Sequence, residues 1–182
     1  YVLIGNMTTS VVREYDSTTG AFISVLCPCP GPADMRIGPN GNLYICSYTN
    51  SLVREVNAIT GAPVNQWSQT FGDRTNDIAF LPNGNILVTV MSSNVCYVYS
   101  PALVLLTSFA GTGWFRPHGI DIGPSDGNIY IIDGVTTQVH VFDPVTFTEL
   151  NPAFRSPDPE DKIVDLEFSP DFSDPTPIEE TT

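Results

Sequence analysis

Acidic residues at regular spacing are the part of this sequence best suited to chemistry. They recur in four short apolar segments. These residues are Asp34, Asp77, Asp121, Asp165 and Glu167. Carboxylate oxygens are the ligands that hard cations such as Ca²⁺ prefer. Because like charges repel one another, carboxylates held close together need a compensating partner. The role of these carboxylates therefore depends on how the four segments that carry them are arranged.

A Gly-Asn dipeptide follows three of these segments at a constant interval. Gly41-Asn42, Gly84-Asn85 and Gly127-Asn128 are 43 residues apart. An apolar strand and a Pro-containing turn precede each pair, and further β-rich segments follow it. Pro presets φ, while Asn and Gly accept the left-handed conformation of a tight hairpin. A repeat of this length, with four short strands per unit, is typical of a β-propeller blade.

The chain does not start at the first strand of a repeat unit. Residues 2–5 match a second strand of the unit, residues 11–15 match a third, and a lone first strand is predicted over residues 163–168. We therefore predict an all-β propeller of four-stranded antiparallel blades over residues 1–168. It has about four blades, and the two ends of the chain share one, which removes exposed sheet edges. Residues 169–182, rich in Pro and acidic residues, are predicted to be a tail or linker.

The third unit resembles the NHL-type propeller repeat. The matching segments are Arg116-Pro117-His118-Gly119-Ile120-Asp121-Ile122, Gly127-Asn128-Ile129-Tyr130-Ile131-Ile132-Asp133 and Val139-His140-Val141-Phe142-Asp143. The Asp/Asn-x-x-Thr-Gly turns are similar to those of secreted bacterial NHL proteins and of gluconolactonase-like propellers. This resemblance implies the propeller fold, which hosts lyases, lactonases, ligand binders and scaffolds. NHL propellers usually have about six blades, so this chain either closes as a smaller ring or is part of a longer protein.

The first strand of each blade lines the central channel of a propeller, and its side chains alternate between two faces. One face of the predicted first strands is apolar, whereas the other carries all five acidic residues and Arg36. We predict an acidic channel with His118 just outside its mouth. Two interpretations remain open. The carboxylates accept backbone N–H groups beside water, or they bind a cation such as Ca²⁺, with Asp77, Asp121 and Asp165 as ligands.

Catalysis would need a base and an electrophile in one pocket. The resemblance implies metal ligands at the channel mouth, which here would be His118 and the three aspartates named above. The sequence has two histidines, and His140 falls on a third strand, away from the axis. No nucleophile elbow and no paired Ser/His arrangement is present, so no catalytic residue is assigned. Trp67 and Trp114 either form a carbohydrate-binding pocket or pack between blades.

The charge balance restricts the partners. Twenty Asp and Glu residues against seven Lys and Arg give a formal net charge of −13. Such a surface repels phosphate backbones and anionic membranes, so we expect neither nucleic acid nor membrane insertion. Other proteins or copies of the chain itself are the predicted partners. Asn6-Met7-Thr8 is a glycosylation sequon, and a disulfide from Cys27 or Cys29 to Cys46 is predicted.

These features favour a secreted, non-enzymatic propeller that acts as a structural or protein-interaction module of an extracellular assembly. Two alternatives are a metal-dependent lactonase or lyase at the channel mouth and a carbohydrate-binding propeller. A cofactor is not required by the first hypothesis, whereas Ca²⁺ would suit the acidic channel.

Overall fold

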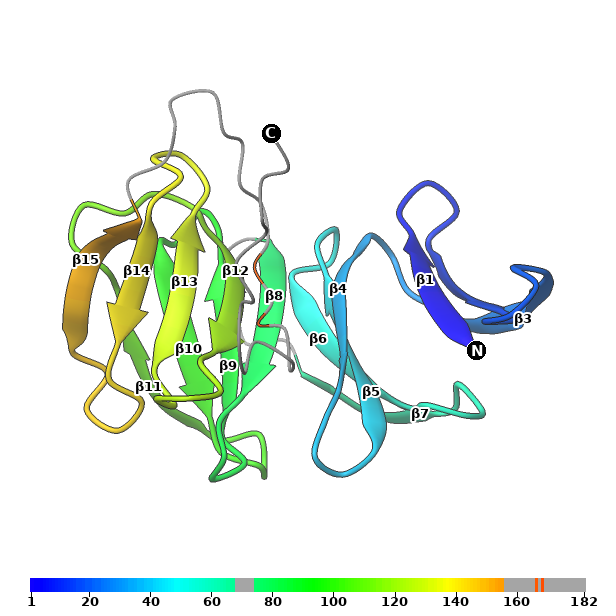
Figure 1. Cartoon of the computed structure of the whole chain (residues 1–182). Coiled ribbons are helices and arrows are strands. Elements are labelled where there is room, and N and C mark those ends of the chain that lie inside the picture. Colours follow the sequence, from blue (N-terminus) through cyan, green and yellow to red (C-terminus); the bar gives the residue numbers. More distant parts are fainter. Residues whose placement is uncertain (68–73, 156–165, 167, 169–182) are drawn as a thin grey trace, which may run out of the picture.

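The computed structural model describes residues 1–67, 74–155, 166 and 168 and contains four antiparallel sheets (Figure 1). Sheet 1 contains β1 (Val2–Asn6), β2 (Val11–Tyr15) and β3 (Phe22–Pro28). Sheet 2 contains β4 (Pro32–Ile37), β5 (Asn42–Ser47), β6 (Leu52–Asn57) and β7 (Pro63–Trp67). Sheet 3 contains β8 (Thr75–Phe80), β9 (Ile86–Val90), β10 (Val95–Tyr99) and β11 (Leu105–Phe109). Sheet 4 contains β12 (Pro117–Ile122), β13 (Ile129–Asp133), β14 (Val139–Phe142) and β15 (Glu149–Arg155).

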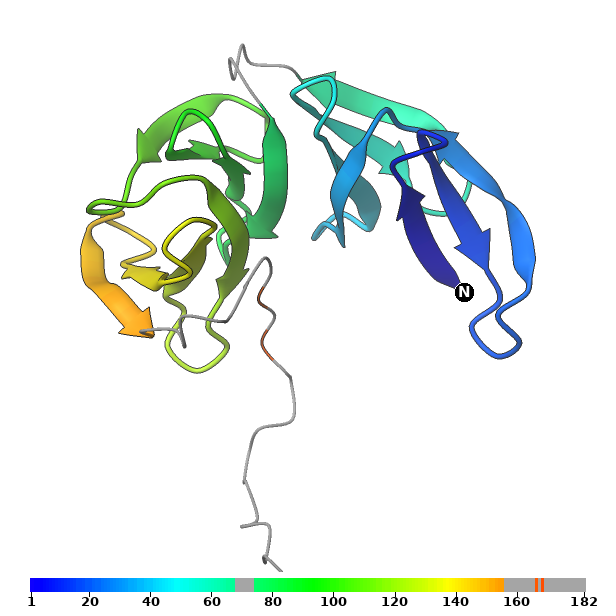
Figure 2. The same cartoon turned by 90° about the horizontal axis from the view of Figure 1, so that it is seen from above.

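Each sheet is a meander in which successive strands pair, and this confirms a β-propeller of about four blades. Seen from above, the sheets follow one another around an open arc (Figure 2). The first strands β4, β8 and β12 contact one another along its inner side. Sheet 1 has three strands among the described residues, and they match the second, third and fourth strands of a blade. The predicted strand at 163–168, the shared blade and the tail at 169–182 lie outside the described residues, except for Leu166 and Phe168. No helix in the described part of the chain has the length and apolar character needed to cross a membrane.

The Gly-Asn pairs lie in the turns between the first and second strands. Gly41, Gly84 and Gly127 have φ values of 78°, 84° and 70°, which favour glycine because it has no Cβ. In each turn the side chain just before the glycine accepts the N–H of the residue just after it. These acceptors are Asn40, Asn83 and Asp126. The local sequence therefore closes each hairpin without help from other blades.

The hydrophobic core lies between successive sheets. Residues 43, 45 and 56 of sheet 2 pack against sheet 1, and residues 44, 46 and 53 on its other face pack against sheet 3. Between sheets 2 and 3, Tyr44 meets Phe80 edge-to-face with ring centroids 4.9 Å apart. Sheets 2 and 3 thus bury both faces, and each depends on its neighbours for stability.

The predicted disulfide is wrong, because all four cysteines are free and buried. Cys27 and Cys29 belong to the core between sheets 1 and 2, where they pack with Ile45. Cys46 follows Ile45 on β5, so its side chain points to the opposite face and joins the core between sheets 2 and 3. Cys96 is a small buried apolar residue between sheets 3 and 4.

Two equivalent glycines offer a test of the packing between blades. Gly20 and Gly61 both have positive φ, 70° and 67°, at the end of matching Asp/Asn-x-x-Thr-Gly turns. A Cβ at Gly20 would meet nothing, whereas a Cβ at Gly61 would overlap the backbone carbonyl of Leu26 in sheet 1. We expect Gly20→Ala to lower the free energy of unfolding by about 1–2 kcal/mol. Gly61→Ala should cost about 1–3 kcal/mol more. Urea unfolding measures both, and equal losses would contradict this packing.

Candidate functional site

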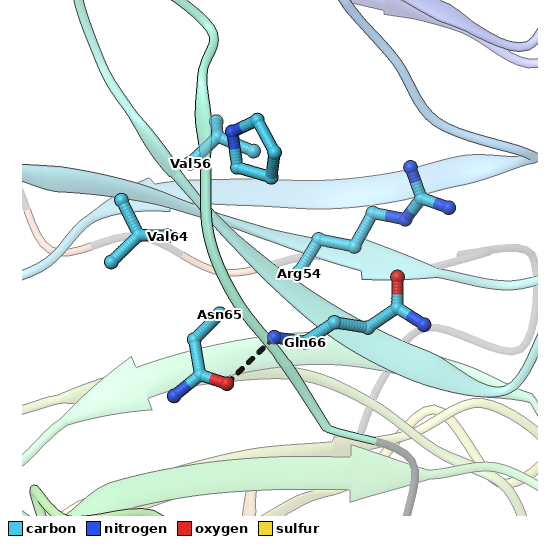
Figure 3. Close-up of a pocket in the computed structure, with 6 residues that line it drawn as sticks. Arg54, Val56, Val64, Asn65 and Gln66 are labelled. Atoms are coloured by element: carbon cyan, nitrogen blue, oxygen red, sulfur yellow. Dashed lines mark hydrogen bonds between the residues drawn. The ribbon is translucent and has the colours of Figure 1, made fainter.

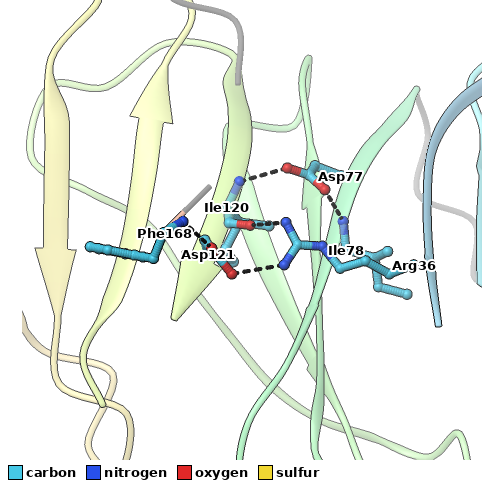
Figure 4. Close-up of polar contacts among 6 residues, drawn as sticks. All are labelled: Arg36, Asp77, Ile78, Ile120, Asp121 and Phe168. Atoms are coloured by element: carbon cyan, nitrogen blue, oxygen red, sulfur yellow. Dashed lines mark hydrogen bonds and ion pairs between the residues drawn. The ribbon is translucent and has the colours of Figure 1, made fainter. Parts of the chain in front are cut away.

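The first strands bring Arg36, Asp34, Asp77 and Asp121 into one polar network, and Figure 4 shows its central contacts. Arg36 on β4 donates from Nη1 to Asp121 Oδ1 at 2.7 Å and from Nη2 to the carbonyl of Ile120 at 3.1 Å. Both acceptors are on β12, so a single side chain ties sheet 2 to sheet 4. Burial alone would lower the pKa of Arg36, but the hydrogen bond to Asp121 and the surrounding negative charges raise it. The guanidinium therefore stays charged.

Asp77 is the most deeply buried carboxyl group of the network, with 3% of the residue exposed. Its Oδ1 accepts the N–H of Ile78 at 2.6 Å, and its Oδ2 accepts the N–H of Ile120 in sheet 4 at 2.7 Å. Burial, and then the hydrogen bond and charge of Asp34, raise the pKa of Asp77 well above its usual range. Asp34 Oδ2 is also buried, and it has no hydrogen-bond partner among the described residues.

Asp121 repeats this cross-blade contact one blade further on. Its Oδ1 accepts the hydrogen bond from Arg36 Nη1, and its Oδ2 accepts the backbone N–H of Phe168 at 2.9 Å. Both oxygens of Asp77 and both oxygens of Asp121 are therefore occupied by protein donors. For these two residues the structure supports acceptance of backbone N–H groups, the first of the two interpretations of the acidic channel.

The cation interpretation has less support from the described residues. Among them, no group of three or more His, Cys, Asp or Glu side chains is arranged to hold a metal ion. Of the three predicted ligands, Asp165 lies outside the described residues, as does Glu167 of the acidic channel. Binding of Ca²⁺ by those two residues stays a prediction.

His118 is on β12, as predicted, but its ring lies away from the network. A Cβ on Gly134 would overlap this ring, which places it beside the loop that follows β13. Burial and the charge of Arg116 lower the pKa of His118, and Asp133 opposes them. The backbone carbonyl of His118 accepts the Thr89 hydroxyl at 2.7 Å, another link between sheets 3 and 4. The predicted lactonase set of His118 with the aspartates is thus not assembled in the described part of the chain.

His140 and Trp114 both pack between blades. His140 on β14 is buried, and its Nδ1 lies 2.6 Å from Glu149 Oε1. Trp114 packs edge-to-face on His140 and donates its indole N–H to the carbonyl of Asn94 at 2.8 Å. Trp114 is therefore unavailable for a sugar, which confirms its packing interpretation. The side chain of Trp67 lies outside the described residues.

Sequence reasoning missed a pocket at the loop end of sheets 3 and 4. Its volume is about 720 Å³, and it is lined by Ser92, Asn94, Phe115, Arg116 and Val135. Asn94 Oδ1 accepts the N–H of Arg116 at 2.8 Å, and the carbonyl of Arg116 accepts the N–H of Gly134 at 3.0 Å. These bonds hold loops from two blades in one arrangement.

Asp133 holds the loops of the same pocket in place through hydrogen bonds to their backbone. It is fully buried and accepts the N–H groups of Phe115, Val135 and Thr136. The sequence signal that could have shown this is Asp133-x-x-Thr136, which matches the Asx turns at Asp16 and Asp143.

A second pocket, of about 330 Å³, lies on β6 and β7 and is shown in Figure 3. Its lining residues are Arg54, Val56, Pro63, Val64, Asn65 and Gln66. Arg54 Nη1 donates to the carbonyl of Pro28 on β3 at 2.8 Å. The arginine therefore helps to join sheets 1 and 2, and the amide groups of Asn65 and Gln66 remain as the polar part of this pocket.

Comparison with known proteins supports the fold and no closer relationship. No protein-family model matches the sequence, and no curated protein matches it either. Many solved structures match. Hydrazine synthase from Kuenenia stuttgartiensis matches with a TM-score of 0.70 at 18% identity, over 83% of this chain and 45% of that chain. The Neurospora crassa Pan2 WD40 domain matches with a TM-score of 0.66 at 14% identity, over 82% of this chain and 44% of that chain.

A selenomethionine-substituted virginiamycin B lyase from Staphylococcus aureus matches with a TM-score of 0.65 at 13% identity, over 80% of this chain and 50% of that chain. The chain thus spans about half the length of the solved structures that it matches. At these identities the likeness shows the propeller fold alone, and the NHL-type assignment stays a prediction.

The pKa of Asp77 leads to a test by pH. The folded protein favours the neutral form of Asp77, so its contribution to stability is complete below the unfolded-state pKa of about 3.9 and is lost as the pH rises through the raised folded-state value. We expect the difference in unfolding free energy between wild type and Asp77→Asn to fall as the pH rises from about 4 to 7. Urea unfolding at a series of pH values measures this difference.

Asp143→Asn is the matched control. The N–H groups of Thr146 and Val145 lower the pKa of exposed Asp143, so its contribution is present above the unfolded-state pKa and is lost as the pH falls. The two variants should therefore differ from wild type with opposite pH trends. A flat difference for Asp77→Asn would show that Asp77 is charged in the folded protein.

Proposed function

We propose that the chain is a non-enzymatic β-propeller module that binds a protein segment in the loop-end pocket of sheets 3 and 4. The observation that carries this proposal is the pairing of an exposed cation with exposed apolar side chains in a pocket held by hydrogen bonds from both blades. Phe115 and Val135 are each 55% exposed, and Arg116, which is also exposed, lines the same pocket. Loops on a rigid scaffold are the usual place for such binding.

The lining indicates the chemistry of the partner. The guanidinium of Arg116 suits a carboxylate, since charge-assisted hydrogen bonds are strong. Phe115 and Val135 suit an apolar side chain, and the polar groups of Ser92 and Asn94 can bond to a peptide backbone. The net charge of −13 repels acidic partners at long range. We therefore propose a segment in which one carboxylate stands beside an apolar residue and basic residues flank both.

The acidity and the Asn6 sequon lead us to propose an extracellular location. Asn6 ends β1, and its Oδ1 accepts the N–H of Thr9 in the turn that follows. Attachment of a glycan there would not disturb a core, because the neighbouring Met7 and Thr8 are exposed. Mass analysis of the protein secreted from eukaryotic cells, before and after glycosidase treatment, tests this location and the modification together.

Arg116 provides the test of the binding module. A labelled peptide with the sequence Lys-Lys-Leu-Glu-Leu-Lys should bind the wild-type protein, and its Glu→Gln form should bind more weakly. Arg116→Ala should weaken binding of the glutamate peptide by about 10- to 100-fold, since hydrogen bonds to charged groups contribute about 1.5–3 kcal/mol. Fluorescence anisotropy measures both affinities.

Arg74→Ala is the control, because Arg74 is also exposed but lies over Tyr48 in another part of the arc. It removes the same charge and should leave the affinity within about twofold. Equal losses of affinity in the two variants would show that net charge alone causes the effect, and this would contradict binding in a specific pocket. Turnover of a lactone by the purified protein, dependent on added Ca²⁺, would contradict the non-enzymatic proposal.

A further inference from the structure

The pocket on β6 and β7 contains a cation that has no negative partner among the described residues. The side chain of Arg54 makes one hydrogen bond to these residues, from Nη1 to the carbonyl of Pro28 at 2.8 Å, and its buried Nε makes none. No carboxylate in the described part of the chain forms an ion pair with Arg54. A partly buried cation gains from a counter-charge, so this guanidinium is suited to bind an anion.

Two other blades supply a partner at the equivalent position. In the strand register, Arg54 occupies the same place in its blade as Arg13 in sheet 1 and His140 in sheet 4. The guanidinium of Arg13 lies over the ring of Phe22 at 5.9 Å, and Nδ1 of His140 lies 2.6 Å from Glu149 Oε1. Each of these partners comes from the outer strand of the same sheet. The outer strand of sheet 2 offers no such ring or carboxylate, so the place of the partner is left to a ligand.

Gln66 is the second polar group on the same side of the pocket. It lies opposite Arg54 across β6 and β7, and Figure 3 shows the two side chains extending in the same direction. Its backbone N–H donates to Asn65 Oδ1 at 2.8 Å, whereas its carboxamide makes no hydrogen bond to the described residues. Because the bond to Pro28 holds the guanidinium in place, Arg54 and Gln66 present pre-positioned donors to one acceptor group.

The rest of the lining indicates the body of the ligand. Val56, Pro63 and Val64 are apolar, and Val64 is 54% exposed. The pocket volume of about 330 Å³ equals that of about eleven water molecules in the liquid, so it holds about as many non-hydrogen atoms. One cation beside three apolar residues suits a single negative charge on a hydrocarbon body. A doubly charged phosphate would add an uncompensated charge to a chain with a net charge of −13.

We propose that this pocket binds a small monocarboxylic acid with an apolar body. The carboxylate accepts hydrogen bonds from Nη2 of Arg54 and from the carboxamide of Gln66, since a planar guanidinium matches the geometry of a carboxylate. The hydrocarbon packs against Val56, Pro63 and Val64. This pocket is distinct from the loop-end pocket of sheets 3 and 4, so the proposal does not depend on the proposed function.

A matched pair of probes tests the charge and the location of the site. Hydrocinnamate has about the size of the pocket and carries one negative charge, whereas hydrocinnamamide has nearly the same shape and is neutral. NMR titration of the isotope-labelled protein should show that the acid binds at least about tenfold more tightly than the amide. Nuclear Overhauser contacts should join the ring of the acid to the methyl groups of Val56 and Val64. No binding of the acid, equal affinities for the two probes, or contacts to another surface would overturn the proposal.

Gln66→Glu tests the site without removing any packing. The new carboxylate would lie opposite Arg54 and pair with it, so it should take the place of the ligand and weaken binding of hydrocinnamate by at least about tenfold. Because opposite charges across paired strands are favourable, the midpoint of urea unfolding should not fall. Gln138→Glu makes the same change in sheet 4 and should leave the affinity within about twofold. A similar weakening in both variants would assign the effect to net charge and overturn the site.

Arg54→Ala removes the cation itself and should abolish the preference for hydrocinnamate over its amide. This variant also loses the bond to Pro28 that joins sheets 1 and 2, so its urea unfolding is compared with that of the wild type. If the folded Arg54→Ala protein keeps the preference for the acid, Arg54 is not the anion-binding group and the proposal is overturned. If the variant does not fold, the result for Gln66→Glu decides, because that substitution leaves the bond between the two sheets in place.

Discussion

The packing of each sheet against the next is the constraint on which the rest of this structure depends. Sheets 2 and 3 are apolar on both faces, and packing against a neighbouring sheet removes each of these faces from water. The same cross-strand positions are buried in sheets 2, 3 and 4, and residue types there vary among Leu, Ile, Val, Tyr and Phe. The packing therefore requires an apolar side chain at each of these paired positions, and several residue types meet this requirement. In sheet 1 the matching residue Val2 is 47% exposed, and none of the described sheets packs on it.

Polar contacts near the axis also fix the position of one sheet relative to another. The carboxylate of Asp77 reaches from sheet 3 to the backbone of sheet 4, and Arg36 reaches from sheet 2 to sheet 4. A buried charge is costly unless it is paired, which explains why the carboxylates of this cluster are compensated by an arginine and by backbone N–H groups. Asp77 and Asp121 thus hold blades in position, whereas the loop-end pocket is lined by exposed groups.

Several features of the fold were predictable because they are local. Gly41, Gly84 and Gly127 mark hairpins whose hydrogen bonds are made within a few residues, so spacing alone located the blades and their first strands. The alternation along β4, β8 and β12 also predicted that Asp34, Asp77 and Asp121 would face the axis. The disulfide could not be judged from cysteine spacing, because only the packing of the sheets places Cys46 in a different core from Cys27 and Cys29. His118 was placed on the correct strand, but its ring packs beside Gly134, a contact made by a loop from elsewhere in the blade.

The sequence by itself determined the blade, its four strands, its turns and the acidic character of the axis, since each follows from periodicity and turn chemistry within 43 residues. Tertiary structure alone decided which carboxyl group has its pKa raised by burial, which arginine joins sheet 2 to sheet 4 and which loops form a pocket. Those properties depend on atoms from different blades, and their distances are set by how sheets pack.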